Sequence, residues 1–134
     1  MQILERLVYR SRASGALASP DVDAIARQSQ ARNEERGITG FLLAHGDAFL
    51  QAIEGTPDAV EKLMAALERD PRHGAIVVVD RRMAPRRLFP HWAMKPLISF
   101  SDTPAIEAIR AQVSGTPDGD YLQAIASDFV SGRP

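Results

Sequence analysis

The sequence predicts an α+β protein of ferredoxin-like type, with helices covering a mixed β-sheet. Three observations support this fold class. The predicted elements alternate as strand, helix, strand, strand, helix, strand, strand; the helix starts carry a Ser-Pro or Thr-Pro pair; and the strands are short apolar runs bounded by turn residues. A length of 134 residues suits one hydrophobic core. We expect a main domain over residues 1–100 and a C-terminal helical extension over residues 101–134 that packs on the sheet.

The first strand and the first helix have clear boundaries in the sequence. Leu4 to Tyr9 is rich in leucine and valine and is followed by polar residues, which predicts a strand. Ser19-Pro20-Asp21 predicts a helix start, because serine caps, proline is tolerated in the first turn and an acid suits the positive helix end. Gly37 predicts the helix end, since glycine commonly closes helices.

The middle of the chain predicts a hairpin followed by a second helix. Residues 38–44 and 48–54 form two strands joined by a short turn at residues 45–47. Thr56-Pro57-Asp58 repeats the cap, proline and acid of a helix start. Asp70-Pro71 ends this helix, because the residue before a proline avoids the helical region.

The last third of the chain predicts two strands and two further helices. Ala75 to Val79 is a continuous apolar run, which predicts a strand buried on both faces. A last short strand includes Trp92 and Met94, which share one face of it. Two helices over residues 103–112 and 118–130 are expected to cover the second face of the sheet.

Composition excludes several classes of function. The net charge of -1 leaves no basic excess for a phosphate backbone, so we expect no nucleic-acid partner. The chain has no cysteine, and its three histidines (His45, His73 and His91) show no ligand spacing, so no metal site is expected. No apolar run is long enough to span a bilayer and the N-terminus does not resemble a signal peptide. A cytoplasmic protein without a membrane partner is therefore expected.

Two polar residues interrupt the apolar stripe of the first helix. Continuing the stripe of Val22, Ile25 and Ala26 by helical spacing leads to Ser29 and then Asn33. These hydrogen-bonding side chains therefore occupy positions expected to face the core. The alternative is that the last helical turn is simply solvated, and the pattern alone does not decide between the two.

A second pair of polar residues lies on the inward faces of predicted strands. Gln51 shares a face with Phe49 and Ile53, and both faces of its strand are apolar, so an unpaired amide there would cost about 1–3 kcal/mol. Its partners are either backbone groups or a ligand. Tyr9 also needs a partner for its hydroxyl, and Gln51 fits if the two strands are neighbours. The alternative for Tyr9 is a core tyrosine at the sheet edge.

Glu54 lies at the end of the same strand as Gln51. We expect it to be a solvated strand end rather than a catalytic acid.

Five short motifs in order resemble the BLUF family, the sensors of blue light using FAD. They cover roughly residues 3–100 without a large gap. The motifs are Leu7-Val8-Tyr9-Arg10-Ser11, Ser29-Gln30-Ala31-Arg32-Asn33 with Gly37-Ile38-Thr39-Gly40, Phe49-Leu50-Gln51-Ala52-Ile53-Glu54-Gly55, Asp70-Pro71-Arg72-His73, and Arg86-Arg87-Leu88-Phe89-Pro90-His91-Trp92-Ala93-Met94.

The resemblance implies a non-covalently bound FAD, with residues 1–100 as the flavin-binding domain. It implies that Asn33 hydrogen-bonds the polar edge of the flavin ring and that Gln51 contacts both the flavin and Tyr9. The residues that it implies for the cofactor site are Tyr9, Ser29, Arg32, Asn33, Gln51, Asp70, Arg72 and His73. Ala66 departs from the pattern, because some members carry a basic residue there, so selectivity for FAD over FMN or riboflavin is left open.

The function implied is that of a blue-light photoreceptor and not of an enzyme. Tyr9 supplies an electron and a proton, Gln51 relays the proton and rearranges, and the signal passes to Trp92 and Met94. A stand-alone member of this kind would signal to a downstream partner protein, as a homo-oligomer. The main alternative is a cofactor-free interaction module with a ferredoxin-like fold.

Overall fold

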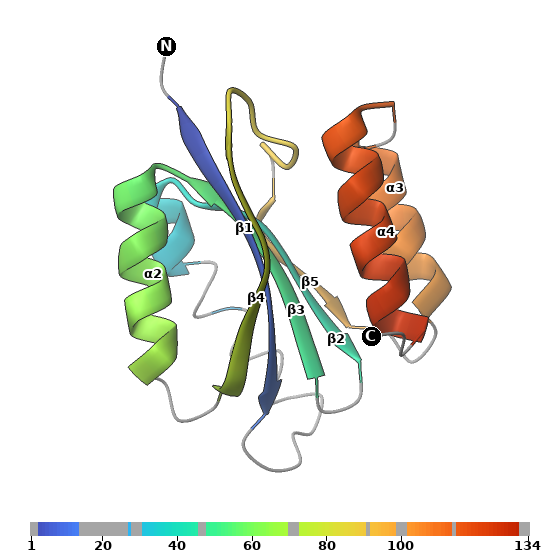
Figure 1. Cartoon of the computed structure of the whole chain (residues 1–134), viewed down its shortest axis with the longest axis horizontal. Helices are drawn as coiled ribbons and strands as arrows, with labels where there is room; N and C mark the ends of the chain where they lie inside the picture. Colours follow the sequence, from blue (N-terminus) through green and yellow to red (C-terminus); the bar gives the residue numbers. More distant parts are fainter. Residues whose placement is uncertain are drawn as a thin grey trace.

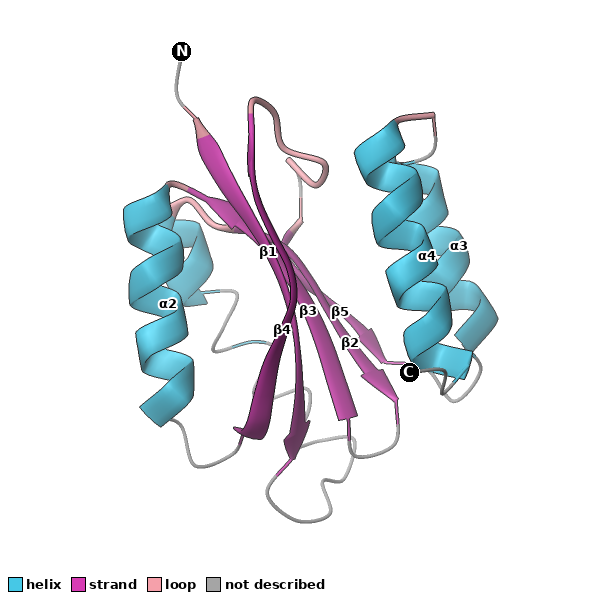
Figure 2. Cartoon of the chain, viewed as in Figure 1, coloured by secondary structure: helices cyan, strands magenta, loops and turns pink. Residues whose placement is uncertain are grey.

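A five-stranded β-sheet forms the centre of the computed structural model, with helices on both of its sides (Figures 1 and 2). The structure describes residues 3–13, 27, 31–45, 48–69, 73–90, 92–98, 102–113 and 115–131. The elements are β1 (Leu4–Ala13), β2 (Thr39–His45), β3 (Ala48–Gly55), α2 (Pro57–Arg69), β4 (His73–Ala84), β5 (Ala93–Ile98), α3 (Asp102–Val113) and α4 (Pro117–Ser131).

The sheet confirms the predicted fold class. Its strand order is β4-β1-β3-β2-β5; the β2–β5 pair is parallel and the other pairs are antiparallel, so the sheet is mixed. β1 extends four residues further than predicted, because Arg10 to Arg12 continue the ladder with β3. The polar side chains that suggested an end to this strand do not prevent its backbone from pairing.

Thr-Pro pairs begin α2 and α4 as predicted. The Thr56 hydroxyl accepts a hydrogen bond from the Ala59 amide at 3.2 Å, and the Thr116 hydroxyl accepts one from the Gly119 amide at 3.0 Å. Each hydroxyl thereby satisfies a backbone donor that the first helical turn leaves without an intrahelical partner.

The helix that precedes β2 also ends where predicted, although its predicted start lies outside the described residues. Residues 31–36 are helical, and Gly37 has φ 68°. The Ile38 amide donates to the Asn33 carbonyl at 2.9 Å, and the Gly37 amide donates to the Glu34 carbonyl at 3.4 Å. This pair of bonds is the Schellman motif, which fixes the direction in which the chain leaves the helix.

The sheet has an apolar cluster on each side. We call the side covered by α2 and by helical residues 31–36 the α2 face, and the side covered by α3 and α4 the α4 face (Figure 1). The buried cluster of the α2 face consists of Leu7, Tyr9, Ile38, Leu42, Ala44, Phe49, Ile53, Ala59, Val60 and Leu63. The cluster of the α4 face consists of Val8, Phe41, Leu43, Leu50, Ala52, Phe89, Trp92, Ile109, Val113, Leu122, Ala126 and Phe129.

The prediction that residues 75–79 form a strand buried on both faces is wrong. The segment lies in β4, which is an edge strand, and the side chains of Val77 and Val78 are 58% and 50% exposed. An apolar run gives the strand, but it does not give the position of that strand within the sheet. The division of the chain at residue 100 stays a prediction.

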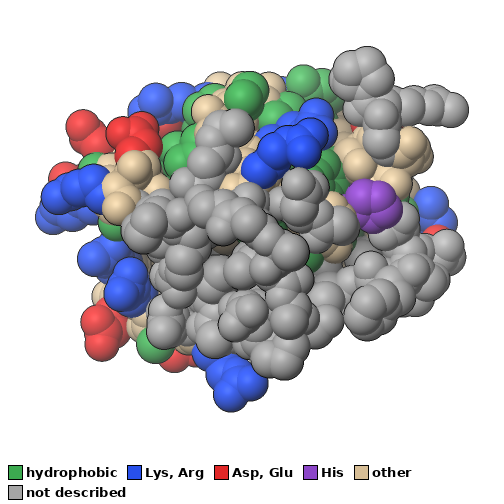
Figure 3. Space-filling view, turned by 90° about the horizontal axis from the view of Figure 1, so that it is seen from below, with side chains coloured by type: hydrophobic (Ala, Val, Ile, Leu, Met, Phe, Trp, Pro, Cys, Tyr) green, Lys and Arg blue, Asp and Glu red, His purple; other side chains and the backbone are tan. Residues whose placement is uncertain are grey.

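Two findings bear on the function classes excluded above. Among the described helices, none is long and apolar enough to cross a membrane, and the described residues contain no group of three or more potential metal ligands. Figure 3 views the molecule from below, and along the left margin of this face acidic and basic side chains are interspersed. Such a mixture fits the net charge of -1.

Candidate functional site

Tyr9 and Gln51 are directly opposite one another in the β1–β3 ladder. Both side chains are buried, with exposed fractions of 1% and 3%. Gln51 lies between Phe49 and Ile53 along β3, and these two residues belong to the cluster of the α2 face, as Tyr9 does. The predicted neighbourhood of these strands is confirmed, and the strand geometry directs both polar side chains to the same face.

The Tyr9 hydroxyl is a buried donor without a hydrogen-bond partner in the described part of the chain. Burial raises the pKa of this hydroxyl well above its ordinary value. Tyr9 is therefore protonated at neutral pH and retains a proton that it can give away. Because a buried hydroxyl normally finds a partner, the site is chemically incomplete without a further polar group.

Asn33 is the second incomplete group on the α2 face. Its side chain is fully buried, and neither its oxygen nor its nitrogen has a partner among the described residues. The alternative of a solvated helix end is therefore wrong for Asn33. The Schellman bond from Ile38 holds its backbone in place, so the amide is presented to the protein interior by a fixed helix end.

These groups fit the edge of a flavin ring. An amide donates with its nitrogen and accepts with its oxygen, and a flavin edge offers a carbonyl beside a ring N–H. Two unsatisfied atoms on one buried side chain would cost about 1–3 kcal/mol each if no ligand were present. Asn33 therefore has the chemistry that the cofactor requires, from a side chain with no other described role.

The structure leaves several predicted site residues without a description. Ser29, Asp70 and Arg72 lie outside the described residues. His73 begins β4, but the orientation of its side chain is not described. Arg32 is described and exposed, next to the buried Asn33. Contacts of these residues with a cofactor stay predictions.

Trp92 precedes β5, and its side chain packs in the cluster of the α4 face. Its ring stacks on Phe89 with centroids 5.3 Å apart, and its carbonyl accepts a hydrogen bond from the Gly40 amide at 2.6 Å. Trp92 thus lies on the opposite side of the sheet from the cluster that contains Tyr9. The side chain of Met94 is not described, so the predicted common face of these two residues stays a prediction.

The expectation of a solvated strand end at Glu54 is wrong. Glu54 is buried, and its carboxylate accepts hydrogen bonds from the backbone amides of Leu88 at 2.6 Å and Phe89 at 2.8 Å. The Arg6 guanidinium also donates to it, at 3.2 Å. The partners lie far away in the sequence, which is why the local pattern did not reveal them.

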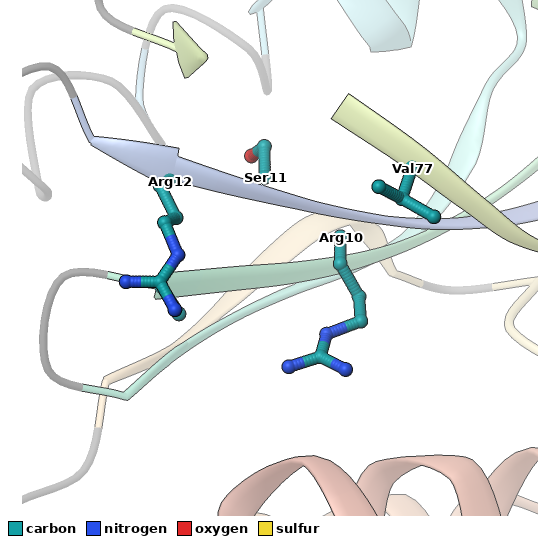
Figure 4. Close-up of a pocket in the computed structure, with 5 residues that line it drawn as sticks. Arg10, Ser11, Arg12 and Val77 are labelled. Atoms are coloured by element: carbon teal, nitrogen blue, oxygen red, sulfur yellow. The ribbon is translucent and has the colours of Figure 1, made fainter. Parts of the chain in front are cut away.

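A hollow of about 210 Å³ lies beside β1 and is lined by Arg10, Ser11, Arg12, Ala48 and Val77. Figure 4 shows the Arg10 and Arg12 side chains leaving β1 on one side and Ser11 on the other. The Arg10 guanidinium lies 5.4 Å from the centre of the Phe129 ring of α4. The hollow contains none of the predicted site residues, and its arginines face the helices of the opposite layer from Tyr9.

Comparison with known proteins decides the family. The family model described as sensors of blue light using FAD matches residues 4–95, which is more than half of the chain. This chain belongs to the BLUF family. It is accordingly a blue-light sensing domain, and FAD is the cofactor typical of its family. The resemblance found in the five sequence motifs is confirmed.

Curated BLUF relatives are much longer than this chain. The chain is 33% identical over 129 residues to the photoactivated adenylate cyclase subunit beta of Euglena gracilis. It is also 33% identical over 92 residues to the subunit alpha of that organism. The matches cover 96% and 67% of this chain but only 14% and 9% of those proteins.

Solved BLUF structures share the fold. One described as BlrP1 BLUF has a TM-score of 0.84 and 31% identity, and the match covers 98% of this chain and 92% of that one. The dark-state structure of BlrB, a BLUF protein, has a TM-score of 0.71 and 37% identity, covering 96% and 98%. A structure of Klebsiella pneumoniae BlrP1 with FMN and cyclic diGMP has a TM-score of 0.82 and 33% identity, covering 96% of this chain and 34% of that one.

Proposed function

We propose that Tyr9 and Gln51 are the photoactive pair of this BLUF domain and that Asn33 anchors the flavin. One observation carries the proposal. Tyr9 and Gln51 lie directly opposite each other, on the face of the sheet where the buried Asn33 amide also lacks a hydrogen-bond partner among the described residues. Ser29, Arg32, Asp70, Arg72 and His73 complete the proposed cofactor site through their place in the family motifs.

Tyr9 is the proposed donor of an electron and a proton. When bound, FAD supplies absorption of blue light and a strong oxidant in its excited state. Burial raises the pKa of the Tyr9 hydroxyl and keeps it protonated, so the electron and the proton are available from the same side chain. Phenylalanine at this position would keep the ring but could supply no proton.

Gln51 is the proposed relay, because the two ends of its amide are nearly equal in shape and opposite in hydrogen-bonding polarity. It relays the proton that leaves Tyr9, and its amide rotates or tautomerises before the electron returns to Tyr9. The net result is a changed hydrogen-bond network around a flavin that is itself chemically unchanged. Trp92 and Met94 are proposed to transmit this change, as the residues that open the last strand.

The proposed output is a signal to another protein and not a reaction catalysed by this chain. Names of the curated relatives join BLUF sequences to adenylate cyclases, which supports an effector as the partner. We propose a downstream signalling protein, with the domain acting as a homo-oligomer. A cytoplasmic location stays a prediction. The cofactor-free interaction module is not favoured, because it leaves the buried Asn33 amide without a purpose.

Cofactor binding provides the test. Purified protein freed of flavin would be titrated with FAD, FMN and riboflavin, and binding followed by quenching of flavin fluorescence. The proposal expects saturable binding of FAD with one site per chain. Failure to take up any of the three flavins would contradict it, whereas equal affinity for all three would show that the anchor is the ring edge alone.

A further inference from the structure

A buried carboxylate ends the strand that carries Gln51. Glu54 lies three residues further along β3, and its side chain is 1% exposed. One carboxylate oxygen accepts from the Phe89 amide at 2.8 Å and the other accepts from the Leu88 amide at 2.6 Å. Glu54 therefore ties the backbone of Leu88 and Phe89 to β3, the strand that carries Gln51. This segment comes just before Trp92, and the Phe89 ring stacks on the Trp92 ring.

Arg6 connects this carboxylate to the rest of the molecule. Each of its three guanidinium nitrogens donates to a different structural element. Its Nε donates to Glu54 at 3.2 Å, Nη1 to Asp118 of α4 at 2.9 Å, and Nη2 to the Arg86 carbonyl at 3.2 Å. Arg6 is almost as buried as Glu54, so separating the two side chains would leave a buried charge without its partner, and the contact resists being broken.

The far end of this chain of contacts lies on the first turn of α4. Asp118 binds Arg6 through one oxygen, and through the other it accepts from Arg82 of β4 at 3.0 Å. The Arg82 guanidinium also lies 4.8 Å from the centre of the Tyr121 ring of α4. Figure 1 shows α4 on the opposite side of the sheet from α2. Arg6 and Glu54 alternate along their strands with Leu7 and Ile53 of the α2 face, so the network lies on the α4 face and is joined to Gln51 through the backbone of β3.

We propose that Glu54, Arg6 and Asp118 form a relay that carries the light-induced change from the Gln51 strand to α4. Glu54 is a positioning residue in this relay: it holds the Leu88–Phe89 backbone and, through Arg6, the N-terminal turn of α4. A shift of β3 or of the Trp92 segment moves the Glu54 carboxylate, and the Arg6–Asp118 contact transmits the shift. The relay rests on the proposed function of Tyr9 and Gln51.

A network of this kind suits transmission better than apolar packing does. Hydrogen bonds to a carboxylate are directional, so a small displacement of Glu54 must be followed by its donors or must break their bonds. Arg87 adds a second tie between the same segment and the helix end that presents Asn33. Its guanidinium donates to the backbone carbonyl of Gly37 at 2.7 Å and to the backbone carbonyl of Glu54 at 3.0 Å. The segment before β5 is thus bound both to β3 and to the Asn33 helix.

Asp118 is the residue to vary, because it is 42% exposed and its replacement does not leave a buried carboxylate or a buried cavity. Asp118→Asn and Asp118→Ala remove the charge that binds Arg6. Asp120→Asn is the matched control: Asp120 is an acid of the same first turn, and in the described part of the chain it makes no ion pair with Arg6 or Arg82. All variants are made in the full chain, loaded with FAD.

Two measurements are made on each protein in the dark and under blue light: the flavin absorption spectrum, and hydrogen–deuterium exchange of the amides of residues 117–131. In the parent protein and in Asp120→Asn, light should shift the spectrum and change the exchange of α4. In both Asp118 variants the spectral shift should remain, and the exchange rates of α4 should be equal in dark and light.

A light-dependent change of α4 that survives in both Asp118 variants would overturn the relay, as would its loss in Asp120→Asn. A spectral shift in the parent protein without any change in α4 would also overturn the relay, while leaving the photoactive pair intact. Absence of the spectral shift in the parent protein would contradict the proposed function itself, and the relay with it.

Discussion

Tyr9 and Gln51 are cross-strand partners in the β1–β3 ladder, and both side chains are buried on the α2 face of the sheet. The pairing places a phenol and an amide on the same face of two adjacent strands. Strands of a sheet are rigid supports compared with loops, so the relative position of the two groups is fixed by the fold.

Replacement of Tyr9 by phenylalanine should remove the light response and retain the flavin. The ring that packs in the apolar cluster is kept, so folding and FAD affinity should change little, whereas the proton donor is lost. Absorption spectra before and after blue light measure the response, and flavin fluorescence measures binding. A persistent reversible red shift in Tyr9→Phe would show that the electron comes from another residue.

Asn33→Ala should weaken FAD binding about 10- to 100-fold, because it removes a donor and an acceptor worth about 1–3 kcal/mol together. Titration with FAD measures the affinity of the variant and of the parent protein. Glu35→Ala is the control, since Glu35 is an exposed residue of the same helix end. Unchanged affinity in Asn33→Ala, or an equal loss in both variants, would contradict the anchor role.

Gly40→Ala should destabilise the protein far more than Gly37→Ala. Gly40 has φ 145°, and a Cβ there would lie 1.8 Å from the Ala52 carbonyl oxygen in the neighbouring strand. Gly37 has φ 68°, but nothing lies within 4 Å of its Cβ position. We expect a loss of at least about 2 kcal/mol for Gly40→Ala and about 1 kcal/mol for Gly37→Ala. Urea unfolding measures both, and equal losses would contradict the close β2–β3 approach.

Asp118 should make a stabilising contribution that disappears in acid. The hydrogen bond from Arg6 is the main cause that lowers the pKa of this carboxyl, and the charges of Arg6 and Arg82 add to it. A lowered folded-state pKa means that the contribution is present above the unfolded value of about 3.9 and is lost as the pH falls through the folded value. Because the side chain is 42% exposed, the contribution should not exceed about 1 kcal/mol.

Urea unfolding of the parent protein and of Asp118→Asn, at neutral pH and near pH 3, measures this effect. The difference in unfolding free energy between the two proteins should be present at neutral pH and should shrink at the lower pH. A difference that stays constant, or that grows in acid, would show that the Arg6–Asp118 ion pair is not its source.

The sequence predicted the fold class well because its strongest signals are local. Thr56 and Thr116 mark helix starts through their own hydroxyl groups, and Gly37 marks a helix end through its own backbone. The buried position of Gln51 followed from the alternation of its neighbours along one strand. The pairing of Tyr9 with Gln51 needed one step more, the strand order, which the ferredoxin-like pattern supplied.

The features that were wrong or missed depend on distant parts of the chain. The apolar run of Val77 to Val79 carries no information on whether a neighbouring strand lies beyond it, and none does within the described residues. The burial of Glu54 depends on Arg6, Leu88 and Phe89, which are separated from it by 34 to 48 positions. Similarly, the stacking of Trp92 on Phe89 places it on the α4 face, which its strand pattern could not reveal.

The most direct test of the central claim is the absorption spectrum of the purified protein with FAD, recorded in the dark, under blue light and again after return to the dark. A Tyr9–Gln51 pair beside the flavin predicts a yellow protein whose flavin band shifts to longer wavelength in the light and returns in the dark. A protein that binds FAD but shows no light-induced shift, or only irreversible bleaching, would contradict the account.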